Sequence, residues 1–169
     1  MPTIEPLAAT PAQDFSVALS DFIRVVQFRD RDRACCYDLS VTQCYALERI
    51  VHSGPLTVNE LAAALYLDKS TASRVANSLV GKGILERRGD PDDGRVVRLA
   101  PTDRGDSIHQ RIEADLVGEY TDLLADFEPA VQAASAEVVR RLATAFSKRI
   151  DVSNGRCCAV PPTPSGATR

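Results

Sequence analysis

Aromatic residues are scarce in this sequence: they make up 5% of the 169 residues, while hydrophobic residues make up 44%. A chain of this length can bury a sizeable core, and the scarcity of aromatics favours helices packed through Ala, Leu and Val. No apolar run approaches the roughly 20 residues that a membrane-spanning helix needs. The first residues, Met1 to Glu5, lack the basic and apolar regions of a signal peptide. We therefore expect a helical, cytoplasmic protein without a membrane partner.

The residue patterns of common enzymes are missing as well. The sequence contains no nucleophile paired with a base and no metal-hydrolase spacing, and Gly81-Lys-Gly83 is too short to be a phosphate loop. The two histidines, His52 and His109, are more simply structural or solvated residues than ligands, which disfavours a histidine-rich zinc site. We expect a protein that is not an enzyme and needs no cofactor to fold.

Charge is unevenly distributed along the chain. The formal net charge of the whole chain is −3, but residues 69–104 contain eight basic and five acidic residues and so carry +3. The remainder of the chain therefore carries −6. A local basic segment on an acidic protein is typical of a chain that binds DNA at specific sites, whereas a general nucleic-acid coat is basic overall.

The hydrophobic pattern near the start predicts one amphipathic helix after a short arm. Residues 1–12 contain three prolines and show no periodicity, which indicates a flexible arm. Apolar residues from Phe15 to Val26 then recur at helical spacing, over roughly three to four turns. Residues 29–33 alternate in charge and are interpreted as a solvated helix end or connection.

Three capping signals predict the next helices. Ser40-Val-Thr-Gln43 matches a capping box, in which Ser and Gln satisfy each other's backbone donors, and opens a helix from about Val41 to His52. Thr57-Val-Asn-Glu60 is a second capping box before a short helix. Asp68 is a candidate N-cap for a helix from about Lys69 to Gly81. Two short helices joined at residues 65–68 predict a helix-turn-helix.

The remaining pattern predicts a hairpin and two long helices. Residues 85–88 and 95–99 are strand candidates, and the turn formers at residues 89–94 would form the tip between them. A long helix should start at Pro101-Thr102 and continue to Glu128-Pro129, and a last helix should follow to about Ile150. The sequence therefore predicts a mainly α protein with a small β-hairpin wing.

The second helix of the helix-turn-helix has a polar face suited to DNA. Short hydrogen-bonding side chains and one cation can approach base edges and phosphates in a major groove. A merely solvated helix would more often present Glu and Lys. The candidate DNA contacts on this face are Ser70, Thr71, Ser73, Arg74, Asn77 and Ser78.

The hairpin adds a second candidate contact. Arg95 is near its tip, and an arginine on a hairpin can enter a minor groove, where narrow A·T tracts concentrate negative potential. Asp93 can support the wing by holding the guanidinium through a charge-assisted pair. The alternative is that Asp93 and Arg95 only stabilise the turn.

These segments resemble the MarR family of bacterial regulators. The similarity is carried by residues 56–75, 79–87 and 99–105 and most specifically by Asp90-Pro-Asp-Asp-Gly-Arg95, and it covers roughly residues 15–150. It implies a homodimer that binds a palindromic operator in double-stranded DNA and releases it when a ligand or oxidant changes the spacing of the two DNA-reading lobes.

The resemblance also implies a domain organisation. A single domain would span residues 13–150, with a winged helix-turn-helix core at about 40–101. Dimerisation helices would lie at about 13–32 and 102–150, and their apolar faces agree, since a lone protomer could hardly bury them all. Residues 151–169, rich in Pro, Gly, Ser and Thr, would form a flexible tail containing cysteines.

The cysteines depart from the general family pattern. Two adjacent pairs lie outside the DNA-binding core, and thiolates favour soft metal ions. Three thiolates would suit trivalent arsenic or antimony, or mercury, and four would suit zinc or cadmium. The candidate metal ligands are Cys35, Cys36, Cys44, Cys157 and Cys158. We therefore predict a repressor that a thiophilic metal or metalloid releases from DNA.

Other interpretations of the effector stay open. Cys44 occupies an apolar helical position and can be a small core residue. The thiols can instead form a redox switch, in which a low-pKa cysteine, such as one near Arg33, is oxidised and resolved by a partner thiol. A third interpretation is a repressor that responds to a small aromatic ligand, with structural cysteines.

Overall fold

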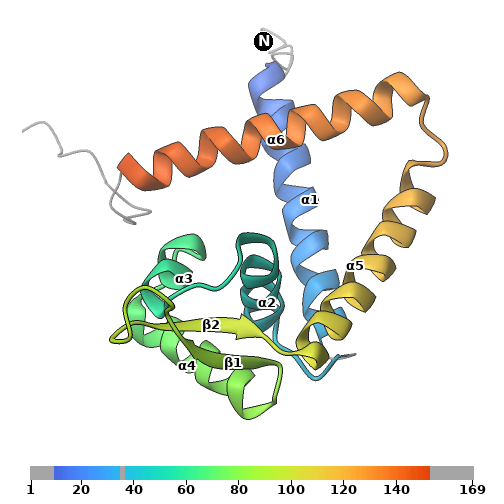
Figure 1. The fold of residues 1–169 in the computed structure, drawn as a ribbon. Coiled ribbons are helices and arrows are strands. Elements are labelled where there is room, and N and C mark those ends of the chain that lie inside the picture. Colours follow the sequence, from blue (N-terminus) through green and yellow to red (C-terminus); the bar gives the residue numbers. More distant parts are fainter. Residues whose placement is uncertain (1–9, 35–36, 153–169) are drawn as a thin grey trace, which may run out of the picture. The chain divides into compact units, whose positions relative to one another are not determined.

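The computed structural model describes residues 10–34 and 37–152, and it confirms a mainly helical fold with one antiparallel hairpin (Figure 1). The chain divides into two compact units, residues 1–112 and 113–169, and the boundary falls within a helix. Whether residues 13–150 act as a single domain stays a prediction. The elements of the described residues are α1 (Pro11–Ala34), α2 (Val41–Ser53), α3 (Val58–Ala64), α4 (Lys69–Gly81), β1 (Leu85–Gly89), β2 (Val97–Pro101), α5 (Asp103–Leu124) and α6 (Pro129–Val152).

Helix α1 is longer than the pattern of apolar residues indicates. It begins at Pro11 because Thr10 and Gln13 form a reciprocal cap: the Gln13 backbone N–H donates to Thr10 Oγ1 at 3.3 Å, and the Thr10 N–H donates to Gln13 Oε1 at 2.7 Å. Proline is suited to the first helical position, where its missing N–H leaves no bond unmade. The helix also continues through residues 29–33 to Ala34.

The three predicted caps of α2, α3 and α4 are confirmed. Ser40 with Gln43 and Thr57 with Glu60 form complete capping boxes. The Asp68 side chain accepts the Thr71 backbone N–H at the start of α4. The ends of α2 and α4, the two of these helices with predicted bounds, differ from those bounds by one residue or less.

The turn between α3 and α4 uses a residue in the left-handed region. Tyr66 has φ +54°, and the Leu67 N–H donates to the Ala62 carbonyl at 2.9 Å across it. Helix α4 ends in the same way around Gly83, which has φ +65°, with the Ile84 N–H donating to the Leu79 carbonyl at 3.0 Å. Both turns change the chain direction sharply. The first packs α4 against α3, and the second leads the chain from α4 into β1.

The hairpin pairs β1 with β2, with Arg87 opposite Leu99 and Arg88 opposite Arg98. Strand β2 starts at Val97, two residues later than predicted, because the tip closes on itself. The Asp90 N–H donates to the Val96 carbonyl and the Val96 N–H donates to the Asp93 carbonyl, each at 2.9 Å. Arg95 therefore lies in the tip and not in a strand.

One hydrophobic core holds the winged-helix elements together. Helices α2, α3 and α4 and the hairpin, which lie together in Figure 1, contribute its side chains. Leu56 adds a backbone bridge to Leu99 beside the hairpin. Leucine and isoleucine side chains fill this core, so it is well packed although the sequence has few aromatic residues. Its buried residues are Leu39, Ala46, Leu47, Ile50, Leu61, Ala76, Leu79, Ile84, Leu85 and Leu99.

The start of α5 is locked to the segment before β1. Thr102 Oγ1 donates to the Gly83 carbonyl at 2.8 Å, and the Gly105 N–H donates to the same hydroxyl at 3.1 Å. Gly105 is buried, and a Cβ placed there would lie 2.2 Å from the Ile84 carbonyl oxygen. This contact requires glycine.

The second unit contains the end of α5 and the whole of α6. Helix α5 ends at Leu124, and Gln132 Nε2 donates to the Leu124 and Phe127 carbonyls at 3.0 and 2.8 Å, which closes the connection to α6. Among the described residues, no helix is long and apolar enough to cross a membrane.

Candidate nucleic-acid interface

Helix α4 divides into a buried side and a polar side. Ala72, Ala76 and Leu79 are buried in or beside the core. Of the predicted contacts, the exposed ones are Ser70, Arg74 and Asn77, and the half-buried ones are Thr71, Ser73 and Ser78. The six predicted contacts therefore differ in solvent exposure: three are exposed and three are half-buried.

The first turn of α4 is organised by the Asp68 carboxylate. Ser70 Oγ donates to it at 2.5 Å, and Thr71 donates through its hydroxyl at 2.7 Å and its backbone N–H at 2.8 Å. The Ser70 hydroxyl, followed by that of Thr71, holds the pKa of Asp68 well below its usual range. Arg74 in turn donates to Thr71 Oγ1 at 2.9 Å. The hydroxyls are thus oriented by the cap, and Arg74 is directed toward the start of the helix.

Asn77 is linked to the hairpin. Arg87 of β1 donates from a terminal guanidinium nitrogen to Asn77 Oδ1 at 2.6 Å. Arg87 shares a hairpin face with Leu85 and Leu99, because partners directly opposite each other in an antiparallel pair point the same way. That face packs against α4, and Arg87 reaches Asn77 at its edge.

Ser78 faces α2. Gln43 Nε2 donates to Ser78 Oγ at 2.8 Å, and Lys82 Nζ lies 3.4 Å from Gln43 Oε1. Lys82 also donates to the Asp38 carbonyl and lies 3.4 Å from its carboxylate. These contacts join the end of α4 to the start of α2 and to the residues just before it.

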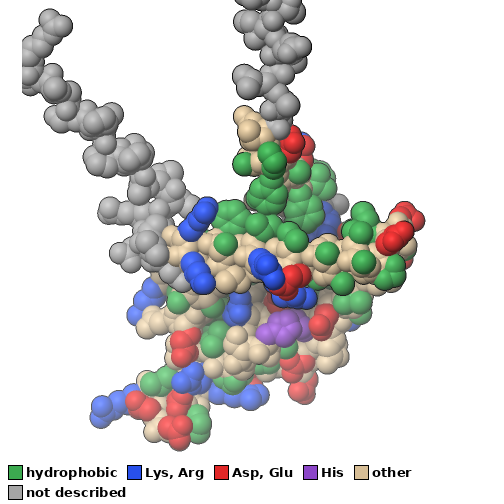
Figure 2. All heavy atoms as spheres, turned by 90° about the horizontal axis from the view of Figure 1, so that it is seen from above, with side chains coloured by type: hydrophobic (Ala, Val, Ile, Leu, Met, Phe, Trp, Pro, Cys, Tyr) green, Lys and Arg blue, Asp and Glu red, His purple; other side chains and the backbone are tan. Residues whose placement is uncertain are grey.

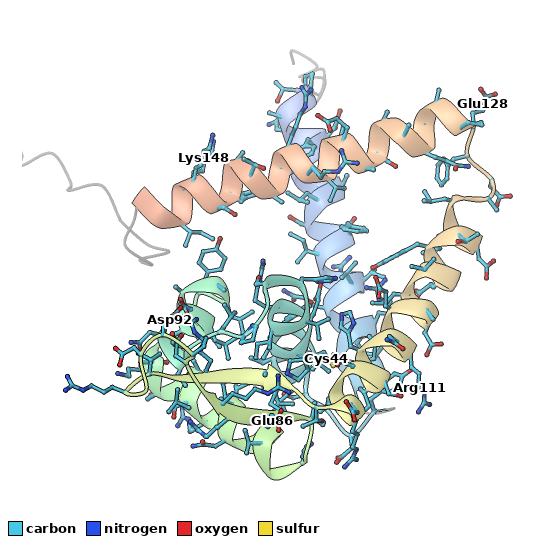
Figure 3. All side chains as sticks on the ribbon, viewed as in Figure 1. Cys44, Glu86, Asp92, Arg111, Glu128 and Lys148 are labelled. Carbon is cyan, nitrogen blue, oxygen red and sulfur yellow. The ribbon has the colours of Figure 1, made fainter. Side chains whose placement is uncertain are left out.

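Arg95 lies exposed at the wing tip, where Asp92 is labelled in Figure 3. Asp93 Oδ1 accepts the backbone N–H of Arg95 at 3.0 Å. Among the described residues, no hydrogen bond or ion pair is formed with the Arg95 guanidinium. Asp93 therefore shapes the backbone of the tip, and the guanidinium is available to a ligand.

Arg98, which the sequence pattern did not identify, connects the wing to the helices. Its guanidinium pairs with Asp90 at the base of the tip and with Glu60 of α3, the latter at 3.1 Å, and it donates to the Pro55 carbonyl at 3.3 Å. The hydrogen bond from Arg98 is the main cause that lowers the pKa of Asp90. For Glu60 the main cause of a lowered pKa is the Thr57 backbone N–H of the capping box, with Arg98 adding to it. One arginine thus links the wing to α3.

The structure describes only one of the five cysteines. Cys44 of α2 is half-buried and packs against the core cluster, and it lies at the opposite side of the winged-helix elements from the labelled wing-tip Asp92 (Figure 3). Within residues 10–34 and 37–152, no three His, Cys, Asp or Glu residues come together to hold a metal ion. The predicted ligands Cys35, Cys36, Cys157 and Cys158 lie outside the described residues.

The alternation of side chains along a strand could have predicted that Arg87 lies next to α4, because it places this residue on the same face as Leu85 and Leu99. No comparable signal exists for Arg98, whose partners are 8 and 38 positions away in the sequence. Its role depends on the tertiary approach of the hairpin to α3.

Comparison with known proteins gives a consistent result. The MarR family model matches residues 37–96. The chain is 28% identical over 136 residues to the uncharacterized HTH-type transcriptional regulator YxaD of Bacillus subtilis, a match covering 80% of this chain and 95% of that protein. It is 36% identical over 94 residues to the multiple antibiotic resistance protein MarR of Salmonella typhimurium, covering 53% of this chain and 65% of that protein.

Solved structures show the same fold. A crystal structure of MarR is 26% identical with a TM-score of 0.63, and the match covers 79% of this chain and 98% of that one. A MarR family protein from Bacillus stearothermophilus is 22% identical with a TM-score of 0.69, covering 83% and 99%. Residues 37–96 therefore match the MarR family, and the chain is similar in sequence and fold to MarR-family transcriptional regulators.

Proposed function

We propose that this chain is a repressor that binds a palindromic operator as a homodimer, with α4 in the major groove and Arg95 in the minor groove. The observation that carries this assignment is the exposed Arg95 guanidinium, which is directed by a tip whose backbone Asp93 holds in place. On α4, Arg74 and Asn77 are exposed and held in fixed orientations by Thr71 and Arg87. Such pre-oriented donors can bind DNA at a small entropic cost.

A homodimer is supported by unburied apolar surface. MarR-family regulators are typically dimers, and large exposed apolar sets mark interaction surfaces in soluble proteins. In the first unit, α1 exposes Phe15, Val17, Phe22, Ile23, Val25 and Phe28. In the second unit, α5, α6 and their connection expose Val117, Tyr120, Leu123, Phe127, Val131, Val138, Val139 and Phe146.

The DNA assignment is tested with duplexes selected from a random library. Replacing Arg95 or Arg74 with Ala should weaken binding of the selected site roughly tenfold. Arg88→Ala is the matched control, because Arg88 is an exposed arginine of the same hairpin whose guanidinium is held by Glu86 at 2.5 Å; it should weaken binding less. Equal affinity of the Arg95→Ala variant and the native protein would reject the wing contact.

We further propose that a thiophilic metal or metalloid bound by Cys35 and Cys36, with Cys44, Cys157 or Cys158, releases the operator. The residues that follow Cys36 support this proposal, because they contact α5 and the end of α4. The guanidinium carbon of Arg111 in α5 lies over the Tyr37 ring, 5.5 Å from the ring centroid. The Asp38 carbonyl accepts a hydrogen bond from Lys82 at the end of α4. A ligand held by Cys35 and Cys36 would act next to a direct connection to the DNA-reading helix.

Arsenite, antimonite, Hg(II), Cd(II) and Zn(II) titrated into the reduced protein–operator complex test the effector. Release should occur with at least one of them and be lost when Cys35 and Cys36 are replaced by Ser. Release by peroxide alone, in the absence of metal, would instead support the redox switch.

A small aromatic effector is a second candidate, supported by a pocket in the first unit. A cavity of about 190 Å³ is lined by Tyr45, Glu48, Arg49, His52 and Leu65. Its size suits one small ring, and Arg49 can pair with a carboxylate. Release by an aromatic acid such as benzoate, lost in Arg49→Ala and retained in the Cys→Ser variants, would favour this candidate.

A further inference from the structure

The contact between Arg87 and Asn77 determines which atoms Asn77 can present to DNA. An asparagine amide has a donor end and an acceptor end, and an amide without a fixed partner can present either by rotating. Arg87 donates to Asn77 Oδ1 at 2.6 Å, and a guanidinium has donors only. The amide oxygen must therefore face Arg87, and the NH₂ group must face away from it.

This orientation matters because the two ends of an amide read different bases. An asparagine recognises adenine in the major groove by donating to N7 and accepting from the N6 amino group. Guanine and thymine present acceptors, O6 and N7 or O4, which need only a donor. With the amide held so that its oxygen faces Arg87, Asn77 presents its NH₂ group, which is matched to the acceptor-bearing edges and poorly matched to the amino group of adenine.

We propose that Arg87 is a specificity-determining residue, which orients Asn77 so that its NH₂ group selects guanine or thymine over adenine at one position of each half-site. This inference rests on the proposed placement of α4 in the major groove. Arg87 acts as a positioning residue, through Asn77. Asn77 is exposed on the same polar side of α4 as Arg74, one helical turn away, so both can face the groove together.

The test is binding-site selection from a random duplex library, sequenced for the native protein and for Asn77→Ala, Arg87→Ala and Arg88→Ala. Asn77→Ala identifies the position, because its base preference should disappear there. At that position the native protein should prefer guanine or thymine over adenine by about tenfold. Arg87→Ala frees the amide to rotate and should reduce this preference to within about threefold.

Arg88→Ala removes the same charge from the adjacent residue, whose guanidinium is held by Glu86 and does not contact Asn77. It should keep the native preference, so a general loss of positive charge is separated from a change in amide orientation. Circular dichroism checks that each variant is folded.

Three results would overturn the proposal: a native preference for adenine at the Asn77 position, an unchanged preference in Arg87→Ala, or no position that responds to Asn77→Ala. Failure of the proposed function is distinguishable, because the native protein would then select no sequence at all.

Discussion

Because Gly105 has no side chain, the first turn of α5 can pack directly against the backbone of Ile84 before β1. It lies in the first turn of α5, where Thr102 binds the Gly83 and Ile84 carbonyls and aligns the helix with the start of β1. Such a close approach of helix to backbone leaves no room for a Cβ. The docking of α5 against Ile84 thus depends on one residue.

Gly105→Ala should lower the free energy of unfolding by about 3 kcal/mol or more, because the Cβ would overlap a backbone oxygen that cannot rotate away. Gly118→Ala is the matched control in the same helix: nothing lies within 4 Å of its Cβ position, and it should stabilise by about 0.5–1 kcal/mol. Urea denaturation measures both. Equal stability of the two variants would contradict the close contact.

At the scale of elements, the two ends of the hairpin are held differently: the strands pack on the core through Leu85 and Leu99, whereas ion pairs hold the tip. Arg98 connects Asp90 of the tip to Glu60 of α3, while Asp90 also accepts the backbone N–H groups of Asp92 and Asp93 at 2.9 and 3.1 Å. The orientation of the tip, and with it Arg95, therefore depends on ionised carboxylates.

The attachment of the wing should weaken in acid. The pKa of Asp90 is lowered in the folded protein, mainly by Arg98, and a lowered folded-state pKa contributes stability that is fully present above the unfolded value of about 4. That stability is lost as the pH falls through the folded pKa. The difference in free energy of unfolding between the native protein and Arg98→Met should thus shrink between pH 5 and pH 2.

Urea denaturation across this range measures the difference, with Arg88→Met as the control for loss of an exposed arginine held by one carboxylate. A native-to-Arg98→Met difference that stays constant down to pH 2 would show that Asp90 is not stabilised by Arg98.

The sequence was sufficient for elements whose signals are local. The capping boxes at Ser40 and Thr57 set helix starts within a few residues, and these predictions are confirmed. The Thr10–Gln13 cap is equally local, but the prolines around it obscured the pattern. Arg98 could not have been predicted, because its role depends on the distance between the hairpin and α3. Strand β2 was placed two residues early because the tip bonds that delay it form only in the folded loop.

At the scale of the molecule, α1 carries apolar surface that one protomer leaves exposed. Figure 2 shows hydrophobic side chains gathered where α1 meets the undescribed residues before it. Phe22 is 62% exposed, and burying a phenylalanine side chain contributes roughly 1.5–3 kcal/mol. Several such side chains on one helix favour association of two copies over exposure to water.

If α1 forms part of the dimer interface, Phe22→Glu should shift the protein toward monomer, because a buried carboxylate without a partner is strongly unfavourable. Gln27→Glu adds the same charge to an exposed polar position of the same helix and should leave the dimer intact. Sedimentation equilibrium measures the oligomeric state of both. A palindromic site is bound through two half-sites, so the Phe22→Glu monomer should also bind it with much lower affinity, while its affinity for a single half-site stays close to that of the Gln27→Glu variant. A Phe22→Glu protein that remains dimeric would place the interface elsewhere, and a monomer that keeps full affinity for the palindrome would separate DNA binding from dimerisation.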